Sequence, residues 1–302
     1  MIRLISPRRL EELGIMGMNR RNIGFIGKYN PRRNYPLVDD KLLTKKAALE
    51  NDIPAPELYA VIEAQHQIAR ATRDLAERGA FVIKPVQGSG GKGILVITGR
   101  EGESFRKSSG TLISAAEVRR HLSNILAGLY SLGGRNDKAM VEAMIQFDPY
   151  LEKYSYEGVP DVRVIAFRGV PVMAMVRCAT HASDGKANLH QGAVGVGIDI
   201  ETGRTLNAVL EGKCCTQHPD TGRNLIGIAY PNWEDIRDVA VRAAKISGLG
   251  YTGVDVVMDD RMGPAILEIN ARPGLDIQIA NGAGLRQRVH EVFCGSHTGK
   301  DL

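Results

Sequence analysis

The sequence predicts an α+β fold, in which helices are mixed with antiparallel β-hairpins along one chain. The first observation is a pair of strand-like runs on either side of the Gly-rich stretch 87–93. The second is a longer pair of apolar runs joined by the turn-forming residues 260–263. The third is length, because 302 residues with 43% hydrophobic content can form two or three closely associated lobes.

Local patterns place the elements in order along the chain. Helices are expected at 39–50, 62–78, 115–129, 233–247 and 285–293. Strands are expected at 80–86, 94–98, 139–145, 162–167, 170–177, 251–258 and 264–270, with short strands in the irregular stretch 180–224. Gly79 is a good C-terminal cap for the second helix. Ser114 and Glu117 form a capping box in front of the third helix, and Asn232 can cap the fourth.

Charge is unevenly distributed along the chain. The net charge is +5, but residues 1–36 alone carry eight basic and only two acidic side chains. A basic segment in front of a nearly neutral body predicts an anionic partner, such as an acidic substrate, a phosphate or a membrane surface; a solvated basic face is the alternative. Nucleic acid is not expected, because the segment has few aromatic residues and matches no known nucleic-acid-binding module.

Composition also bounds the class of protein. No run approaches the roughly 18 apolar residues that a membrane helix requires, and the first residues lack the apolar core of a signal peptide. The four cysteines show no metal-site spacing. We therefore expect a cytoplasmic protein in a reducing compartment.

Gly88, Gly90 and Gly93 lie between two predicted strands. A dinucleotide-binding loop would lead directly into a helix, and a Walker loop would need Ser or Thr after its lysine, so both are excluded. The remaining interpretation is a flap whose backbone N–H groups close over phosphates, with Lys84 on the incoming strand as their charge partner. A plain surface hairpin with a glycine turn is the alternative.

The second hairpin places carboxylates opposite each other. If 260–263 form a four-residue loop, Asp255 lies directly opposite Glu268. Alternation then puts Asp255, Glu268 and Asn270 on one face and apolar side chains on the other. Two carboxylates across a ladder repel each other, so a cation is expected between them, and oxygen ligands suit Mg²⁺. A solvent-facing strand pair in a shifted register is the alternative.

The order of the motifs resembles the ATP-grasp superfamily, specifically its RimK-type and alpha-L-glutamate ligase-related carboxylate–amine ligases. The segments that carry the resemblance are Asp40-Lys41, Ile53-Pro54-Ala55-Pro56, Lys84-Pro85, Gly88-Ser89-Gly90-Gly91-Lys92-Gly93, Glu142-Ala143-Met144, Asp161-Val162-Arg163, Arg177, Asn188-Leu189-His190-Gln191-Gly192, Asp255, Glu268 and Asn270-Ala271-Arg272-Pro273-Gly274. The series covers about residues 39–282. Each motif alone is weakly diagnostic, whereas the complete series in this order is specific.

The resemblance implies an ATP-grasp fold of two α+β lobes that grip ATP between antiparallel sheets. The lobe with the glycine flap is expected at 39–145 and the lobe with the Mg-binding hairpin at 146–302. A basic segment, 1–38, stands where most members of the superfamily have a complete preceding domain. The identity of the acceptor substrate therefore cannot be transferred from the family.

The resemblance also implies a set of site residues. The expected ATP contacts are Lys41, Lys84, Gly88, Ser89, Gly90, Gly91, Gly93, Glu142, Ala143, Met144, Asp161 and Asn188. Two Mg²⁺ ions, for which Mn²⁺ can substitute, are expected on Asp255, Glu268 and Asn270. The acid that contacts the ribose is one of Asp148, Glu152 and Asp161.

The implied reaction joins a carboxylate to an amine. The carboxylate attacks the γ-phosphate of ATP, and the amine opens the resulting acyl phosphate to an amide. Lys84, Arg177 and Arg272 are the candidate catalytic residues, because a guanidinium grips a carboxylate or phosphate bidentately. A surface ion pair is the alternative for Arg177. An ATP-grasp kinase that phosphorylates a hydroxyl and a non-catalytic ATP-binding module are the rival functions.

The expected partners are small-molecule or peptide substrates, a carboxylate and an amine. The basic segment favours an acidic acceptor, and glutamate is the amino acid that the resemblance proposes for addition. A homo-oligomer is compatible with the sequence.

Overall fold

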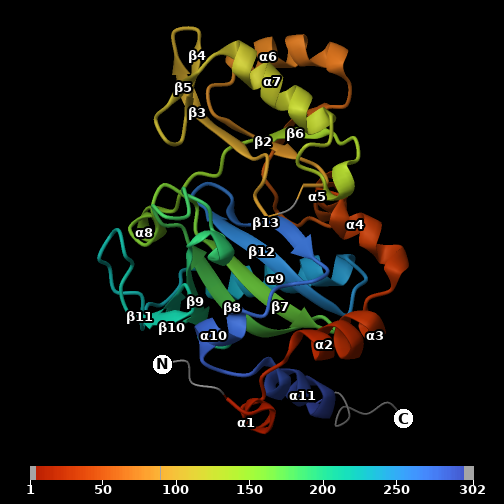
Figure 1. Cartoon of the computed structure of the whole chain (residues 1–302), viewed down its shortest axis with the longest axis vertical. Coiled ribbons are helices and arrows are strands. Elements are labelled where there is room, and N and C mark those ends of the chain that lie inside the picture. Colours follow the sequence, from red (N-terminus) through yellow and green to blue (C-terminus); the bar gives the residue numbers. More distant parts are fainter. Residues whose placement is uncertain (1–4, 89, 296–302) are drawn as a thin grey trace. The chain divides into compact units, whose positions relative to one another are not determined.

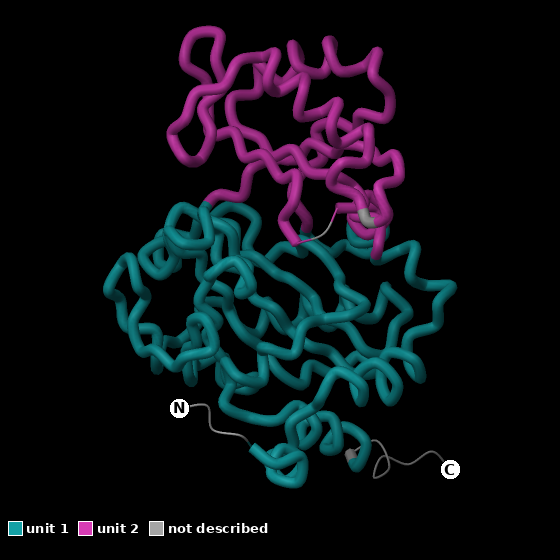
Figure 2. Tube along the Cα trace, in the orientation of Figure 1, with its two compact units in different colours: residues 1–38, 47–54, 147–302 teal, residues 39–46, 55–146 magenta. Residues whose placement is uncertain are grey.

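The computed structural model describes residues 5–88 and 90–295, so the predicted ATP contact Ser89 lies outside the described residues. The chain divides into two compact units (Figure 2). Unit 1 comprises residues 1–38, 47–54 and 147–302, and unit 2 comprises 39–46 and 55–146. The basic N-terminal segment thus belongs to the same unit as the C-terminal half of the chain. Helix α5 (Lys41–Glu50) begins in unit 2 and ends in unit 1.

Unit 2 is built on a six-stranded antiparallel sheet in the order β1-β6-β2-β3-β4-β5 (Figure 1). Its strands are β1 (Leu58–Ile62), β2 (Phe81–Pro85), β3 (Leu95–Glu101), β4 (Ser104–Lys107), β5 (Leu112–Ile113) and β6 (Ala139–Glu142). Its helices are α6 (Ile68–Ala76) and α7 (Ala115–Leu126), with short 3-10 turns η3 (Gln65–Gln67) and η4 (Leu132–Gly134). Strands β2 and β3 form the predicted hairpin around the glycine-rich stretch.

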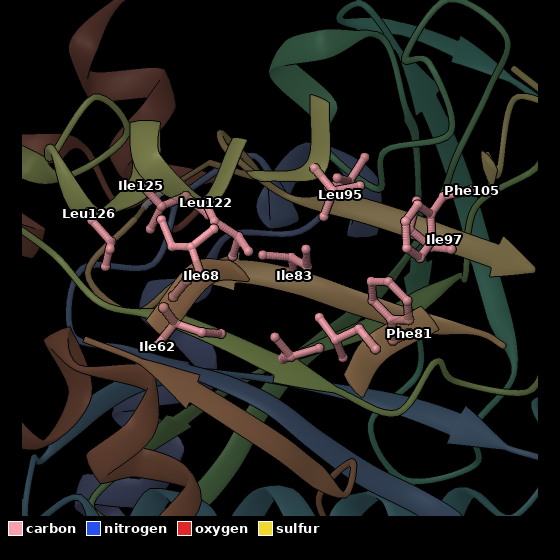
Figure 3. Packing of buried hydrophobic residues seen from close by; sticks show 14 residues of the cluster. Ile62, Ile68, Phe81, Ile83, Leu95, Ile97, Phe105, Leu122, Ile125 and Leu126 are labelled. Carbon is pink, nitrogen blue, oxygen red and sulfur yellow. The ribbon is translucent and has the colours of Figure 1, made fainter. Parts of the chain in front are cut away.

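Helices α6 and α7 bury their apolar faces with residues of this sheet (Figure 3). The capping box of α7 is confirmed, since the Glu117 N–H donates to Ser114 Oγ at 3.2 Å and the Ser114 N–H donates to Glu117 Oε2 at 2.8 Å. The predicted helix at 62–78 corresponds to the 3-10 turn Gln65–Gln67 and to α6, which ends at Ala76. Its first residue, Ile62, instead ends strand β1 and pairs with Ala139 of β6.

Unit 1 contains a seven-stranded antiparallel sheet in the order β11-β10-β9-β8-β7-β12-β13 (Figure 1). Its strands are β7 (Asp161–Phe167), β8 (Val170–Cys178), β9 (Val194–Ile198), β10 (Thr205–Leu210), β11 (Lys213–Cys215), β12 (Tyr251–Asp259) and β13 (Gly263–Asn270). Its helices and helical turns are α1 (Pro7–Glu12), α2 (Met18–Arg20), the π-helical turn η1 (Arg21–Ile26), α3 (Gly27–Tyr29), the 3-10 turn η2 (Arg32–Asn34), α4 (Tyr35–Asp39), α8 (Pro149–Glu152), the 3-10 turn η5 (Leu189–Gln191), α9 (Trp233–Ile246), α10 (Ile277–Asn281) and α11 (Leu285–Gly295).

The register of the β12–β13 hairpin is as predicted at the two carboxylates and at Asn270. Asp255 pairs with Glu268, and Gly253 pairs with Asn270. The predicted four-residue loop is wrong, because Asp259 pairs with Gly263 and leaves three residues in the turn. A β-bulge after Asp255 absorbs the difference of one residue. Two deviations, a shorter loop and a bulge, therefore cancel at the carboxylates.

Asn232 occupies the N-cap position of α9 and the helix starts at Trp233, as predicted. The capping hydrogen bond is absent, because Asn232 has a left-handed backbone with φ of 49° and its side chain accepts no bond from the first turn. Trp233 is buried, and its indole Nε1 donates to the Ile200 carbonyl at 3.0 Å. Packing of Trp233 therefore supports the start of this helix in place of a side-chain cap.

The aromatic residues of the basic segment lie inside unit 1. Phe25 contacts Phe167 and Tyr251 with ring centroids 5.6 and 5.8 Å apart, and Tyr29 contacts Phe167 at 5.1 Å. Phe25 and Tyr29 are partly buried and pack against the main core cluster of the unit. None of the described helices combines the length and apolar character that crossing a bilayer requires.

Two leucines within the predicted helix 115–129 differ sharply in burial. Leu122 on α7 is fully buried, whereas Leu129 lies beyond the helix end and is 66% exposed. We predict that Leu122→Ala lowers the free energy of unfolding by about 2 to 5 kcal/mol, because it leaves a cavity. Leu129→Ala should change it by no more than about 0.5 kcal/mol. Urea denaturation of both variants measures the difference, and equal losses would contradict the packing of this unit.

Candidate functional site

A buried charge cluster in unit 2 consists of two lysines around one glutamate. Lys45 Nζ lies 2.6 Å from Glu142 Oε1, and Lys84 Nζ lies 2.5 Å from Glu142 Oε2. Strand β2 carries Lys84, the neighbouring strand β6 carries Glu142, and helix α5 carries Lys45. The Lys45 ammonium also donates to the Pro56 carbonyl. We call Lys45, Lys84 and Glu142 the lysine cluster.

The lysine cluster has a net charge of +1 in a largely buried place. Burial opposes the charge of Lys45 and lowers its pKa, although Glu142 acts in the opposite direction. Burial also opposes ionisation of Glu142, but Lys84 and Lys45 together outweigh it, and the pKa of Glu142 lies below its usual value. When all three groups are ionised, the cluster carries one positive charge more than Glu142 balances, which favours an anion.

Both ends of the glycine-rich stretch contact the segment 127–138, which joins α7 to β6. At its start, Gly88 forms a β-bridge with Ser131, and the Gln87 N–H donates to both oxygens of Asp137 at 3.0 and 3.1 Å. Asp137 is buried and also accepts from Ser131 Oγ at 2.6 Å. Lys41 Nζ donates to the Gly88 carbonyl at 2.5 Å. The predicted phosphate lysine Lys41 is thus in place beside the stretch.

Gly93 ends the stretch and requires the absence of a side chain. Its φ is +76°, and a Cβ would lie 2.6 Å from the ring of Tyr130. His121 Nε2 lies 2.9 Å from the Gly93 carbonyl oxygen, and the rings of His121 and Tyr130 are 5.5 Å apart. Gly90 and Gly91 between the fastened ends also have positive φ.

Ala143 and Met144, two of the predicted ATP contacts, directly follow Glu142 in the chain. The Ala143 N–H donates to the Glu57 carbonyl at 2.8 Å, and the Met144 carbonyl accepts from Gln146 Nε2 at 3.3 Å. Both residues are half-buried. Asp148, one of the three candidates for ribose binding, accepts from the Tyr150 N–H at 2.7 Å and caps α8.

A second charge cluster lies on one face of the sheet in unit 1. The register pairs Asp161 with Arg177, Arg163 with Asp255, and Asp255 with Glu268 across four neighbouring strands. Residues two apart on a strand share a face, which adds Asn270 to the same row. We call Asp161, Arg163, Arg177, Asp255, Glu268 and Asn270 the sheet cluster.

Asp255 is the centre of the sheet cluster. Arg163 grips it through Nε and Nη2 at 2.7 and 2.6 Å, and Arg177 Nη2 reaches its Oδ2 at 2.7 Å. Arg177 also binds Asp161 bidentately. Burial opposes the charge of Asp255, but the two arginines outweigh burial and hold the pKa of Asp255 well below its usual range. Burial raises the pKa of Asp161 above its ordinary value despite Arg177.

Charge balance in the sheet cluster favours a further cation. Two arginines face three carboxylates, which leaves one negative charge when all are ionised. Glu268 is one-third exposed, so its oxygens are accessible, and Asn270 Nδ2 donates to Glu268 Oε1 at 3.2 Å and to Asp255 Oδ2 at 3.4 Å. Among the described residues no three His, Cys, Asp or Glu side chains form a metal-binding group. Two carboxylates and an amide fit Mg²⁺, which completes its shell with water and phosphate oxygens.

The other predicted residues of unit 1 lie outside this row. Asn188 Oδ1 accepts from the His190 N–H at 3.1 Å and caps the 3-10 turn η5. Arg272 is exposed and lies over the ring of Tyr35, with 4.7 Å between the guanidinium carbon and the ring centroid. Arg177, by contrast, is nine-tenths buried. Its contacts make it a residue that holds Asp255 and Asp161 in place.

Sequence reasoning assigned no role to Lys45 or Arg163. A signal existed for Lys45, because it is four residues after Lys41 and therefore lies on the same face of α5. The signal for Arg163 was its place two residues after Asp161 on a strand, which puts both side chains on one face. The pairing of that strand with β12 was not predictable from local sequence.

The chain matches the family model described as "Sugar-transfer associated ATP-grasp" over residues 20–293. It is 24% identical over 203 residues to a "Probable alpha-L-glutamate ligase" of Maridesulfovibrio salexigens, a match that covers 67% of this chain and 46% of that protein. It is 26% identical over 328 residues to the "Cyanophycin synthetase" of Synechocystis sp., covering 95% of this chain and 33% of that protein. The chain therefore spans about a third to a half of the length of these relatives.

Two solved structures share the fold. D-cycloserine synthetase DcsG matches with a TM-score of 0.50 and 16% identity, covering 87% of this chain and 72% of that chain. D-alanine–D-alanine ligase from Bacillus anthracis, solved as a complex with ATP, matches with a TM-score of 0.50 and 12% identity, covering 87% of this chain and 67% of that chain. These matches and the family model confirm the predicted α+β ATP-grasp fold.

Removing the shared acid of the lysine cluster should be costly. We predict that Glu142→Gln lowers the free energy of unfolding by about 3 to 5 kcal/mol, because two buried ammonium groups lose their counter-ion. In the double variant Lys45→Met/Glu142→Gln the loss should be smaller than the sum of the single losses. Denaturant unfolding of the three variants gives the coupling energy, and strict additivity would contradict the buried pair.

The two ends of the glycine stretch differ in the space available. Gly93→Ala should lower the melting temperature in the absence of nucleotide, because its Cβ clashes with Tyr130. Gly90→Ala is the matched control, since it also has positive φ but meets no atom within 4 Å. Differential scanning calorimetry compares them. If Gly90→Ala lowers the melting temperature as much as Gly93→Ala does, the contact of Tyr130 with Gly93 does not hold this end of the stretch in place.

Proposed function

Since the chain belongs to the sugar-transfer associated ATP-grasp family, we propose that it is an ATP-dependent carboxylate–amine ligase. The observation that carries the proposal is the sheet cluster, where the carboxylates of Asp255 and Glu268 lie beside Asn270 on one sheet face. This donor set suits a hard divalent cation that also binds phosphate oxygens. The lysine cluster supplies cations of the kind that bind phosphate groups.

The proposed reaction has two steps. A carboxylate oxygen attacks the γ-phosphorus of ATP, the bond to the bridging oxygen of ADP breaks, and an acyl phosphate forms. An amine then attacks the acyl carbon, inorganic phosphate leaves, and loss of a proton from nitrogen completes the amide. Mg²⁺ bound at Asp255, Glu268 and Asn270 would neutralise part of the charge on the phosphates. Two such ions remain our proposal for the site.

The chain's own residues act mainly by positioning and by charge. We assign Lys41 and Lys84 to the phosphates, with Glu142 holding the Lys84 ammonium in place. The backbone of Gly88, Gly90, Gly91 and Gly93 would donate N–H groups to phosphate oxygens. Arg163 and Arg177 hold the carboxylate of Asp255 ionised and fixed in position. The remaining proposed ATP contacts are Glu142, Ala143, Met144, Asp161 and Asn188.

Arg272 is the proposed group for the substrate carboxylate, since it is exposed and carries a fixed positive charge. Arg177 would act on the reaction through Asp255 and Asp161. The names of the similar proteins support an amino acid as one of the two substrates, with glutamate as the first to test. A small molecule or a peptide can supply the other group.

Trapping with hydroxylamine tests the proposal directly. Incubation with Mg-ATP, hydroxylamine and a pool of carboxylic and amino acids should yield ADP together with a hydroxamate, because hydroxylamine intercepts an acyl phosphate whatever the natural amine is. Lys84→Met and Glu268→Gln should each lower this rate by about 10² to 10³. Lys46→Met and Asp260→Asn change exposed residues of the same types and are the matched controls. Both variants should form hydroxamate at the rate of the unaltered protein.

Other products would decide between functions. A stable phosphate ester formed without hydroxamate would identify a kinase. ATP binding without turnover would identify a binding module. Full rates in both Lys84→Met and Glu268→Gln would contradict the proposed site.

A further inference from the structure

The basic N-terminal segment contacts the loop that follows strand β13. This loop, residues 270–274, begins with the proposed metal ligand Asn270 and contains the proposed carboxylate-binding residue Arg272. Residues 18–38 of the segment belong to the same unit as the loop. We call residues 18–38 the brace and residues 270–274 the site loop. Three separate contacts join them.

The first contact is a buried asparagine. Asn30 is 4% exposed, and its Nδ2 donates to the Tyr251 carbonyl at 2.8 Å and to the Ala271 carbonyl at 3.1 Å. Its Oδ1 accepts from the Tyr251 N–H at 2.8 Å. One side chain thus ties the first residue of β12 to the residue directly after Asn270. Because these groups are buried, losing the partner would leave polar atoms unsatisfied.

The second contact is made by Arg21, whose Nη1 donates to the Pro273 carbonyl at 2.9 Å. Pro273 in turn packs on β12 at Gly253, where a Cβ would lie 2.6 Å from the Pro273 ring. The glycine permits this close approach, and the arginine holds the loop from the other element. The backbone of the site loop is therefore fixed before and after Arg272.

The third contact fixes the side chain of Arg272 itself. Its guanidinium carbon lies 4.7 Å from the centroid of the Tyr35 ring. Tyr35 packs against the main core cluster of unit 1, so its ring is a firm support. A guanidinium held on an aromatic face keeps its edge available for a bidentate contact with a carboxylate.

Two further arginines lie close to Tyr35 in the sequence. Arg32 and Arg33 precede it by three and two residues and are exposed. Within the described part of the chain, Arg32, Arg33 and Arg272 form no ion pair with an acidic side chain. By contrast, Arg8 and Arg9 on α1 both pair with Glu12. Guanidinium groups that have no acidic partner within this part of the chain favour an anionic ligand.

We propose that the brace is a positioning element of the active site, in which Tyr35 sets the place of Arg272 and the surrounding arginines select a carboxylic acid substrate with further negative charge. The proposal rests on the ligase function proposed above. Tyr35 is a positioning residue, because it acts on the substrate through Arg272. The brace performs this task with 21 residues of the same chain.

Tyr35→Leu is the central variant, because it retains an apolar side chain and removes the aromatic face. In the hydroxamate assay it should raise the KM for the carboxylic acid about tenfold and leave the KM for ATP within about twofold. Tyr35→Phe should behave as the unaltered protein. Tyr59→Leu is the matched control, since Tyr59 supports Arg78 in unit 2 at 4.2 Å and should change neither constant.

Two further variants test the same link. Arg272→Gln should raise the same KM, and adding Tyr35→Leu to it should have little further effect, because both changes remove one contact. Arg32→Glu/Arg33→Glu should raise the KM of the acid in a salt-dependent way. The control variant Arg8→Glu/Arg9→Glu makes the same change of charge at positions that are paired with Glu12. It should leave the KM of the acid unchanged.

Hydrogen–deuterium exchange of the peptide covering 270–276 provides a readout that needs no activity. Tyr35→Leu and Asn30→Ala should speed exchange there and leave the strand β2 peptide unchanged. Unchanged exchange at 270–276 would overturn the brace, whether or not the protein is a ligase. Faster exchange with an unaltered KM for the acid would overturn the assignment of Tyr35 and Arg272 to the substrate. Faster exchange in a protein that forms no hydroxamate would contradict the ligase function while retaining the brace.

Discussion

The carboxylate of Asp255 and the two arginines that share it are the interaction on which the sheet of unit 1 depends. A buried carboxylate is unfavourable unless it is paired and hydrogen-bonded, and Asp255 receives Arg163 from β7 and Arg177 from β8. Arg177 requires its own counter-ion, which Asp161 supplies. The charges therefore form a connected row across four strands. Within that row Glu268 is the most exposed of the three acids, and we propose it as a ligand of a divalent cation.

Unit 2 also contains a buried acid that is shared between two basic partners, but here the partners are lysines. One glutamate is shared by two lysines, and the excess charge is positive. We propose that the lysine cluster binds phosphate groups and that the sheet cluster binds a metal ion. The glycine-rich stretch, which we also propose as an ATP contact, is held in place by Asp137, Ser131 and Tyr130, none of which belongs to either charge cluster.

The brace changes the interpretation of the positive charge at the start of the chain. Composition alone presents eight basic residues as a surface for an anionic partner. In the structure these residues have different tasks. Arg8 and Arg9 are paired with Glu12, and Arg21 holds a backbone carbonyl of the site loop. The aromatic residues between them pack against the core. We propose only Arg32 and Arg33, which precede Tyr35 in the chain, for contact with an anionic substrate.

The sequence by itself determined the local features. The capping box of α7 and the hairpin around the glycine stretch follow from spacing and alternation, which act over a few residues. The pairing of Asp255 with Glu268 was predicted correctly although the predicted loop was one residue too long. The order of motifs along the chain was sufficient to recognise the ATP-grasp fold. These predictions succeed because neighbours in the sequence are also neighbours in a turn or a hairpin.

Only the tertiary structure decided which charges meet. Arg163 and Asp255 are 92 residues apart, and Asn30 and Ala271 are 241 apart, so no local pattern links them. The first turn of α9 is supported by burial of Trp233 without a side-chain capping bond from Asn232, and a bulge compensated for the shorter hairpin loop. The physical reason is the same in each case. Burial makes every charge and every polar group dependent on a partner, and the pairing of distant strands determines which partner is available.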